Sequence, residues 1–276
     1  MLRFNYADLC DEIREMKKSY PFLDISSEGK SIKGRSLFCI SFGRGERGIF
    51  INGAHHGMEW ITSPLILKFL KECCECYVSG KRLRGYDIRS IYDKITLFAM
   101  PMVNPDGVDI CISQGLRWQA NARGVDLNHN YNAMWEKAQQ LEKQAGITAP
   151  CASRYGGTAP ESEPETRAVT DFVRKNNIQM LIALHTQGEE IYYNFGGLEP
   201  PESLPIAMQM ARVSGYKLSH PEELASYGGC KDWFINEFRR PGFTIEAGHG
   251  KNPLPPQQFD EIYEKLADIL LVALMP

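Results

Sequence analysis

His56 and Glu59 are the first residues whose types and spacing could perform chemistry. They lie three positions apart, where a β-type run at residues 48–52 gives way to an amphipathic stretch. Side chains at i and i+3 share one face of a helix, so the imidazole and the carboxylate could bind one metal ion. Catalytic zinc often takes two histidines and one glutamate and leaves a fourth position to water. Alternatively, the pair could simply flank a helix start, where the helix dipole favours a carboxylate.

Two further candidate residues lie where strands end. Residues 179–184 and 242–246 have the apolar composition of buried strands; the first runs into His185 and the second ends on Glu246. In α/β sheets, ligands gather at the carboxyl ends of strands. His56, His185 and Glu246 all come at or just beyond such ends, so one fold could bring them into one cleft.

Alternating helices and strands are expected to position these residues. Helices are predicted over residues 5–20, 60–78, 160–176, about 206–213 and 259–274, and strands over 36–42, 48–52, 94–100, 179–184 and 242–246. The short turn at 43–48 predicts that the first two strands are adjacent and antiparallel. This pattern predicts an α/β fold with a twisted, mixed parallel and antiparallel sheet and helices on both faces. No repeat or linker divides the chain, so residues 1–276 are expected to form a single domain.

The bulk composition is that of a soluble globular protein. Hydrophobic residues make up 43% of the 276 residues, charged residues make up 24%, and the net charge is −3. This balance gives no electrostatic reason to expect nucleic acid or an anionic membrane as a partner. The first residues contain no apolar signal core, and the eight cysteines are scattered as in a reduced protein. We therefore expect a cytoplasmic protein, whose oligomeric state the sequence leaves open.

Several segments resemble the zinc metallocarboxypeptidases related to carboxypeptidase A. The four main ones are AHHGMEW at 54–60, NPDG at 104–107, GVDLNHN at 124–130 and FTIE at 243–246. Residues 162–166 and the strand that ends on His185 also match, so the resemblance covers about residues 35–250. Each motif is weak alone, but six in the family order are specific. The resemblance implies a single catalytic domain with a sheet of about eight strands.

The resemblance also implies roles for individual residues. His56, Glu59 and His185 would bind one Zn²⁺ per chain, and Glu246 would be the general base. Zinc lowers the pKa of water and polarises the scissile carbonyl, while a nearby carboxylate takes the proton and later passes it to the leaving amine. Only His56 has the three-residue spacing to Glu59, so His55 is expected to pack beside the site.

The sequence departs from the family in the segment that binds the terminal carboxylate of the substrate. The family has an Asn-Arg pair there, whereas this chain has Asn128 and His129. A titratable ring does not replace a guanidinium fork, which argues against strict exopeptidase action on ordinary C-termini. Asn128 and His129 nevertheless remain candidates for substrate binding. Arg117 is the candidate for stabilising the oxyanion, although it could equally be a surface arginine in a loop.

The segment at 226–233, SYGGCKDW, resembles the loop that lines the specificity pocket of the family. Lys231 lies where the residue type sets the side-chain preference, and a buried ammonium would favour an anionic group. It could instead be a solvated lysine. The mobile tyrosine of the family has Leu224 in its register, so Tyr227 could take that role only if the loop bends differently.

Together with residues 248–255, these features resemble the bacterial branch that cleaves γ-D-glutamyl bonds to meso-diaminopimelate or a similar diamino acid. The resulting prediction is a zinc metallopeptidase whose substrates are small peptides derived from murein. One alternative is a general metallocarboxypeptidase or deglutamylase that releases C-terminal residues. Another is a non-catalytic peptide-binding module, which the presence of all three ligands and Glu246 disfavours.

Overall fold

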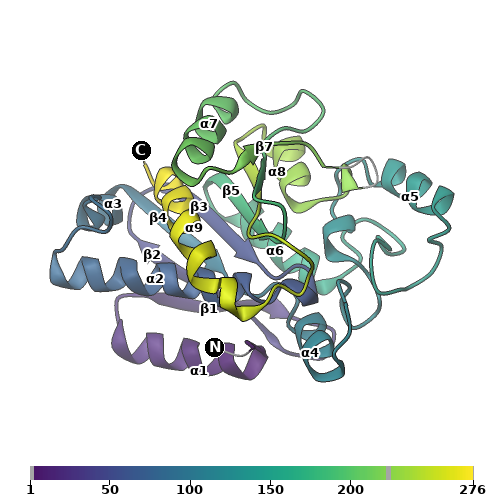
Figure 1. The fold of residues 1–276 in the computed structure, drawn as a ribbon, viewed down its shortest axis with the longest axis horizontal. Coiled ribbons are helices and arrows are strands. Elements are labelled where there is room, and N and C mark those ends of the chain that lie inside the picture. The colour runs from purple at the N-terminus through teal and green to yellow at the C-terminus, as the bar shows by residue number, and fades with distance from the viewer. Residues whose placement is uncertain (1–2, 222–224, 276) are drawn as a thin grey trace.

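An eight-stranded mixed sheet runs through the chain, with helices packed on both faces (Figure 1). This computed structural model describes residues 3–221 and 225–275. The strands are β1 Asp24–Lys30, β2 Ser36–Gly43, β3 Arg47–Gly53, β4 Ile95–Met100, β5 Ile178–His185, β6 Glu190–Tyr192, β7 Lys217–Leu218 and β8 Gly242–Glu246. They lie in the order β1-β2-β4-β3-β5-β8-β6-β7. The α/β fold expected from the sequence is therefore confirmed.

Four parallel strands form the centre of the sheet. β4, β3, β5 and β8 are neighbours in that order, and each pair is parallel. β1 and β2 extend one side by antiparallel pairing, and β6 pairs antiparallel with β8 on the other. Parallel neighbours need crossover connections, which helices usually provide. The carboxyl ends of the four central strands therefore meet at one end of the sheet.

Helices cover both faces of the sheet. They are α1 Tyr6–Ser19, α2 Thr62–Ser79, α3 Ile88–Lys94, α4 Pro105–Gln114, α5 Trp135–Gln144, α6 Pro164–Lys175, α7 Ser203–Ser214, α8 Cys230–Phe238 and α9 Phe259–Ala273, with short 3₁₀ turns η1 Gly57–Glu59, η2 Leu127–His129 and η4 Pro256–Gln258. In Figure 1, α2 and α9 lie over the near face of the sheet.

The central strands contribute side chains to two separate cores. Ile49 and Ile51 of β3 belong to a core shared with α1, α2, α7 and α9, whereas Phe50 faces a second core shared with α6 and α8. β5 repeats the alternation with Ile182 and Leu181. Strands buried on both faces read as nearly continuous apolar runs, which is why the sequence identified them.

The turn between β2 and β3 does not form the expected hairpin. The two strands run in opposite directions, but β4 lies between them and pairs with both. The turn crosses the start of β4, where the Gly45 N–H donates to the Ile95 carbonyl at 3.2 Å. A Cβ at Gly45 would lie 2.0 Å from the carbonyl carbon of Lys94, so glycine permits this close crossing. The short connection predicted the strand direction correctly and the neighbour wrongly.

Several short elements of the fold were not predicted from the sequence. β1, β6, β7, α3, α4, α5 and α8 were not predicted, and α8 begins at Cys230, inside a segment expected to be a loop. β1 has only intermediate and exposed residues, so it carries no apolar pattern to detect. All eight cysteines are free thiols. Among the residues that the structure describes, no helix has the length and apolarity needed to cross a membrane.

Candidate active site

Three parallel strands bring the chemically important residues to one place. β3 leads into His56, β5 ends on His185 and β8 ends on Glu246. His185 and Glu246 are register partners in the ladder between β5 and β8. Main-chain pairing therefore places these two residues side by side, although they lie 61 positions apart in the sequence. The convergence expected at the strand ends is confirmed.

The turn after β3 is held by hydrogen bonds to neighbouring segments. Thr62 accepts the Ala54 N–H at 2.8 Å and donates its hydroxyl to the Glu59 carbonyl at 2.9 Å. Asn104 donates its side-chain amide to the His55 carbonyl at 2.9 Å. The NPDG motif therefore fixes the backbone that carries the metal ligands.

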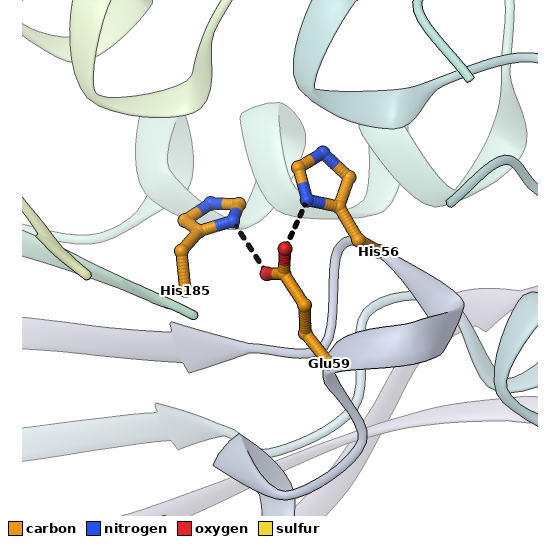
Figure 2. Close-up of side chains that lie close together, drawn as sticks. All are labelled: His56, Glu59 and His185. Atoms are coloured by element: carbon orange, nitrogen blue, oxygen red, sulfur yellow. Dashed lines mark hydrogen bonds and ion pairs between the residues drawn. The ribbon is translucent and has the colours of Figure 1, made fainter. Parts of the chain in front are cut away.

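His56, Glu59 and His185 form a single cluster, which Figure 2 shows from close by. The Nδ1 atom of His56 lies 2.9 Å from Oε1 of Glu59, and the Nδ1 atom of His185 lies 2.9 Å from Oε2 of the same carboxylate. One potential ligand atom from each residue lies within 4.8 Å of the others. Two imidazole nitrogens and a carboxylate oxygen form a donor set that suits zinc.

Asp126 orients His56 from the other side of the ring. Its Oδ1 lies 3.1 Å from Nε2 of His56. When Nε2 donates its proton to Asp126, neutral His56 turns a lone pair from Nδ1 toward the Glu59 carboxylate. A divalent cation between these atoms satisfies both of them, so the residues fit a zinc ion. Such a carboxylate partner also increases the basicity of a histidine ligand.

Asn252 holds the Glu59 carboxylate. Its side-chain amide donates to Oε1 of Glu59 at 3.3 Å and to the Thr186 carbonyl at 2.6 Å. Thr186 returns a hydrogen bond from its hydroxyl to Asn252 at 2.7 Å. Asp126 and Asn252 belong to the motifs seen in the sequence, but neither could be assigned a role, because a supporting residue has no fixed spacing to the ligand that it orients.

Attraction between the histidines and the carboxylates of the cluster offsets the cost of burying their charges. Glu59 is 2% exposed, and burial alone would raise the pKa of its carboxyl, but His56 and His185 lower that pKa to about 2. Burial would likewise lower the pKa of His56, but Glu59 and Asp126 raise it well above its usual value. The carboxylates of Glu59 and Asp126 therefore strongly favour a positive charge at this position.

His55 lies behind the cluster and is not part of the ligand group. Its ring is buried and stacks on His185, with the ring centroids 5.5 Å apart. Its Nε2 lies 2.8 Å from the hydroxyl of Tyr131. Burial lowers the pKa of His55 well below its usual value, so the ring is neutral. The expectation that His55 packs beside the site is confirmed.

A cleft of about 620 Å³ opens over the cluster, and Glu246 lies in its wall. Within the described residues, the Glu246 carboxylate accepts no hydrogen bond. Burial, followed by the charge of Glu59, raises the pKa of Glu246 well above its ordinary value. A carboxylate without a partner, close to a metal site, is free to take a proton from water.

Arg117, Asn128 and His129 also line the cleft. Arg117 is exposed. Asn128 accepts the Cys230 N–H at 2.9 Å. His129 is only 5% exposed, and its Nδ1 lies 3.1 Å from the buried carboxylate of Glu142. His129 therefore does not offer a free cation to a substrate.

Lys231 is buried in the cleft wall. It is 3% exposed, donates to the Asn194 carbonyl at 2.6 Å and forms an ion pair with Asp232. The solvated alternative considered for this lysine is therefore wrong.

Tyr227 is not among the residues that line the cleft. Its hydroxyl accepts a hydrogen bond from Lys137, whose ammonium also lies 4.3 Å from the centre of the tyrosine ring. Leu224, which occupies the register of the family tyrosine, lies outside the described residues. Arg154, which the sequence analysis did not single out, does line the cleft.

Comparisons with known proteins agree with this geometry. A family model described as zinc carboxypeptidase matches residues 9–268. The gamma-D-glutamyl-L-diamino acid endopeptidase 1 of Lysinibacillus sphaericus is 38% identical over 292 residues, which cover 98% of this chain and 72% of the relative.

Solved structures share the fold. Bovine thrombin-activatable fibrinolysis inhibitor, in complex with tick carboxypeptidase inhibitor, has a TM-score of 0.82 at 22% identity, over 99% of this chain and 96% of the other. The murein-tripeptide amidase of Escherichia coli O157 has a TM-score of 0.59 at 22% identity, over 91% of this chain and 92% of the other.

Proposed function

Because this chain belongs to the zinc carboxypeptidase family and is a zinc metallopeptidase, we propose that it hydrolyses the γ-D-glutamyl bond to meso-diaminopimelate, or to a similar diamino acid, in peptidoglycan peptides. His56, Glu59 and His185 are the zinc ligands. The name of the Lysinibacillus relative supports the choice of bond.

The buried ion pair of Lys231 and Asp232 is the main observation that supports the proposed substrate. Both residues line the cleft, and they are 3% and 4% exposed. The far end of meso-diaminopimelate carries an ammonium and a carboxylate, which complement the two charges of this pair. An apolar C-terminal side chain would instead leave both charges without a polar partner from the substrate.

In the proposed mechanism, Glu246 takes a proton from the attacking water and then delivers it to the leaving amine. Zinc, when bound, lowers the pKa of water and polarises the scissile carbonyl. Arg117 is proposed to stabilise the negative charge that develops on the carbonyl oxygen. Asn128 and His129 are proposed to contact the substrate from the cleft wall, and Tyr227 would do so only if its loop rearranged.

The decisive experiment incubates the zinc-loaded protein with L-Ala-γ-D-Glu-meso-diaminopimelate. We expect L-Ala-D-Glu and free meso-diaminopimelate, with no product from the Glu246→Gln variant. Failure to release L-Ala-D-Glu, together with rapid release of C-terminal residues from ordinary peptides, would favour a general carboxypeptidase. Preferential release of C-terminal glutamate would favour a deglutamylase.

We also propose that residues 1–276 form one catalytic domain and that the protein acts in the cytoplasm on small murein-derived peptides. The family model covers residues 9–268, which supports the first point. The composition and the free thiols are compatible with the second. Cell fractionation with an antibody to the protein tests the location, and recovery of the chain outside the cytoplasmic fraction would contradict it.

A further inference from the structure

Arg154 lies beside the metal site on a loop that the sequence analysis did not interpret. Its main-chain N–H donates to Oδ2 of Asp126 at 2.8 Å, while Oδ1 of the same carboxylate lies 3.1 Å from His56. One carboxylate therefore connects the backbone of Arg154 to a zinc ligand. The side chain of Arg154 is half-buried and lines the cleft, as do Asp126 and Asn128.

The guanidinium of Arg154 has no partner among the described residues. Arg123, on a neighbouring part of the chain, is paired with Glu163 at 3.1 Å, and Arg174 is paired with two glutamates. The half-buried Arg47 and Arg240 also lack an anion, but each donates to a main-chain carbonyl, whereas the Arg154 guanidinium has neither kind of partner among the described residues. An unpaired guanidinium that faces a substrate cleft points to an anionic ligand.

A carboxylate is the anion that this position fits. A guanidinium can bind a carboxylate through two parallel hydrogen bonds, which an ammonium or an imidazole cannot reproduce. His129 cannot supply this charge from the adjacent segment, because Glu142 already occupies its Nδ1. Both carboxylate oxygens of Asp126 are also engaged, so Asp126 does not need Arg154 as its counter-ion.

The contacts of the Asp126 segment indicate which carboxylate of the substrate would lie near Arg154. Asn128 connects the Asp126 segment to α8 through the hydrogen bond to Cys230, which immediately precedes Lys231. If the far end of a diamino acid lies against Lys231 and Asp232, its near end must lie toward the metal site. Arg154 lies on that side, beside Asp126.

We propose that Arg154 binds the carboxylate of the diamino acid that adjoins the scissile nitrogen. This inference rests on the proposed function, because it takes the leaving group to be a diamino acid. Arg154 would then supply, from a different segment of the chain, the guanidinium that position 129 lacks.

The test compares two substrates, L-Ala-γ-D-Glu-L-Lys and the same peptide with its C-terminal carboxyl converted to an amide. Arg154→Ala should lower kcat/KM for the free acid by about 10- to 100-fold, mainly through KM, because one charge-assisted contact is lost. The same variant should leave the low activity on the amide unchanged. Arg154→Lys should be intermediate on the acid.

Arg123→Ala is the matched control, because it removes a nearby arginine whose partner is Glu163. It should leave both substrates unaffected. Zinc content and the melting temperature confirm that each variant is folded. An equal loss on acid and amide, or no loss on either, would overturn the role of Arg154.

The outcome also separates this inference from the proposed function. If the wild-type protein cleaves γ-D-glutamyl peptides but Arg154→Ala does not discriminate acid from amide, only the role of Arg154 fails. If the wild-type protein cleaves only ordinary α-linked peptides, the comparison is repeated with one such peptide, once with a free C-terminal carboxyl group and once with a C-terminal amide. Discrimination that depends on Arg154 would then support the carboxylate contact while the proposed substrate fails.

Discussion

At the scale of single residues, the zinc ligands depend on partners that bind no metal themselves. Asp126 orients His56, and Asn252 holds the carboxylate of Glu59. Both partners are buried, so neither interaction is weakened by competition with bulk water. The affinity of the site for zinc is therefore a property of five residues rather than three.

We expect Asn252→Ala to weaken zinc binding by about 10- to 100-fold, because Glu59 loses a hydrogen bond that orients it. Competition with a chelator of known affinity measures this change. Asn177→Ala, just before the opposite end of β5, is the control, since its exposed amide contacts the Glu46 carbonyl and the Gln179 side chain, far from the metal site. Equal zinc affinity in both variants would show that Asn252 does not position Glu59.

The raised pKa of Glu246 predicts a pH-dependent stability. The folded chain retains a proton that the unfolded chain releases, so the stability that Glu246 contributes is complete below its ordinary pKa and is lost as the pH rises through the raised pKa. Glu246→Gln cannot titrate. In zinc-free protein, the wild type should therefore lose stability relative to Glu246→Gln as the pH rises. We expect the free energy of unfolding of the variant, minus that of the wild type, to increase by about 1 kcal/mol or more between pH 5 and pH 8. Urea unfolding at both pH values checks this, and a constant difference would contradict it.

Lys231 should affect both stability and substrate choice. Lys231→Met leaves Asp232 buried without its partner, which we expect to cost about 3 kcal/mol in free energy of unfolding. The double variant Lys231→Met with Asp232→Asn should recover most of that stability but not the proposed cleavage of meso-diaminopimelate peptides. Urea unfolding and product analysis measure the two effects. Recovery of both together would mean that the ion pair has a structural role only.

The sequence predicted the residues of the site that have a fixed spacing or a fixed place at a strand end. His56 and Glu59 are three apart, and His185 follows an apolar strand, so each could be recognised locally. Arg154 could not be predicted, because only the folding of its loop against Asp126 brings it to the cleft. The burial of Lys231 likewise depends on Asn194, which is 37 positions away.

At the scale of elements, the prediction succeeded where burial creates a pattern and failed where it does not. The central strands were recognised because both of their faces are buried. The pairing of β2 with β4 could not be predicted, because a short turn that contains glycine fits two adjacent strands as well as two strands that a later strand separates. The need for glycine at position 45 becomes evident only in the structure, because a Cβ there would overlap the backbone of Lys94, which immediately precedes β4.

Gly45→Ala should therefore be more damaging than an ordinary glycine substitution. Its Cβ would overlap the Lys94 backbone, so we expect a loss of about 3 kcal/mol or more in free energy of unfolding. Gly215→Ala is the control: its φ of +76° makes alanine strained, but no atom lies within 4 Å of the added Cβ. Backbone strain alone should cost only about 1 kcal/mol. Similar losses in urea unfolding would mean that steric overlap at Gly45 is relieved by small shifts.

At the scale of the whole molecule, zinc joins segments that are distant in the sequence. Glu59 and His185 lie 126 positions apart and contact each other through one carboxylate. An ion held by both stabilises only the folded chain, so its binding adds directly to stability. Without the metal, hydrogen bonds, ion pairs and a contact between the two histidine rings connect these ligands.

Removing zinc with a chelator should lower the melting temperature, and adding zinc should restore it. Free zinc at about 1,000 times its dissociation constant would add about 4 kcal/mol to the free energy of unfolding. Differential scanning calorimetry with and without the chelator measures the shift. His185→Ala is the control, since it should show little response to zinc. A wild-type melting temperature that does not change with zinc would contradict a tightly bound ion.

The register between β5 and β8 has a consequence for how this enzyme could diversify. Since His185 and Glu246 are aligned by the main chain, the distance between them does not depend on which side chains form the pocket. Arg154 and Lys231 belong to a separate loop and helix, which can be altered without shifting that alignment. Descendants of such a scaffold could acquire new peptide preferences while they inherit the same hydrolytic apparatus unchanged.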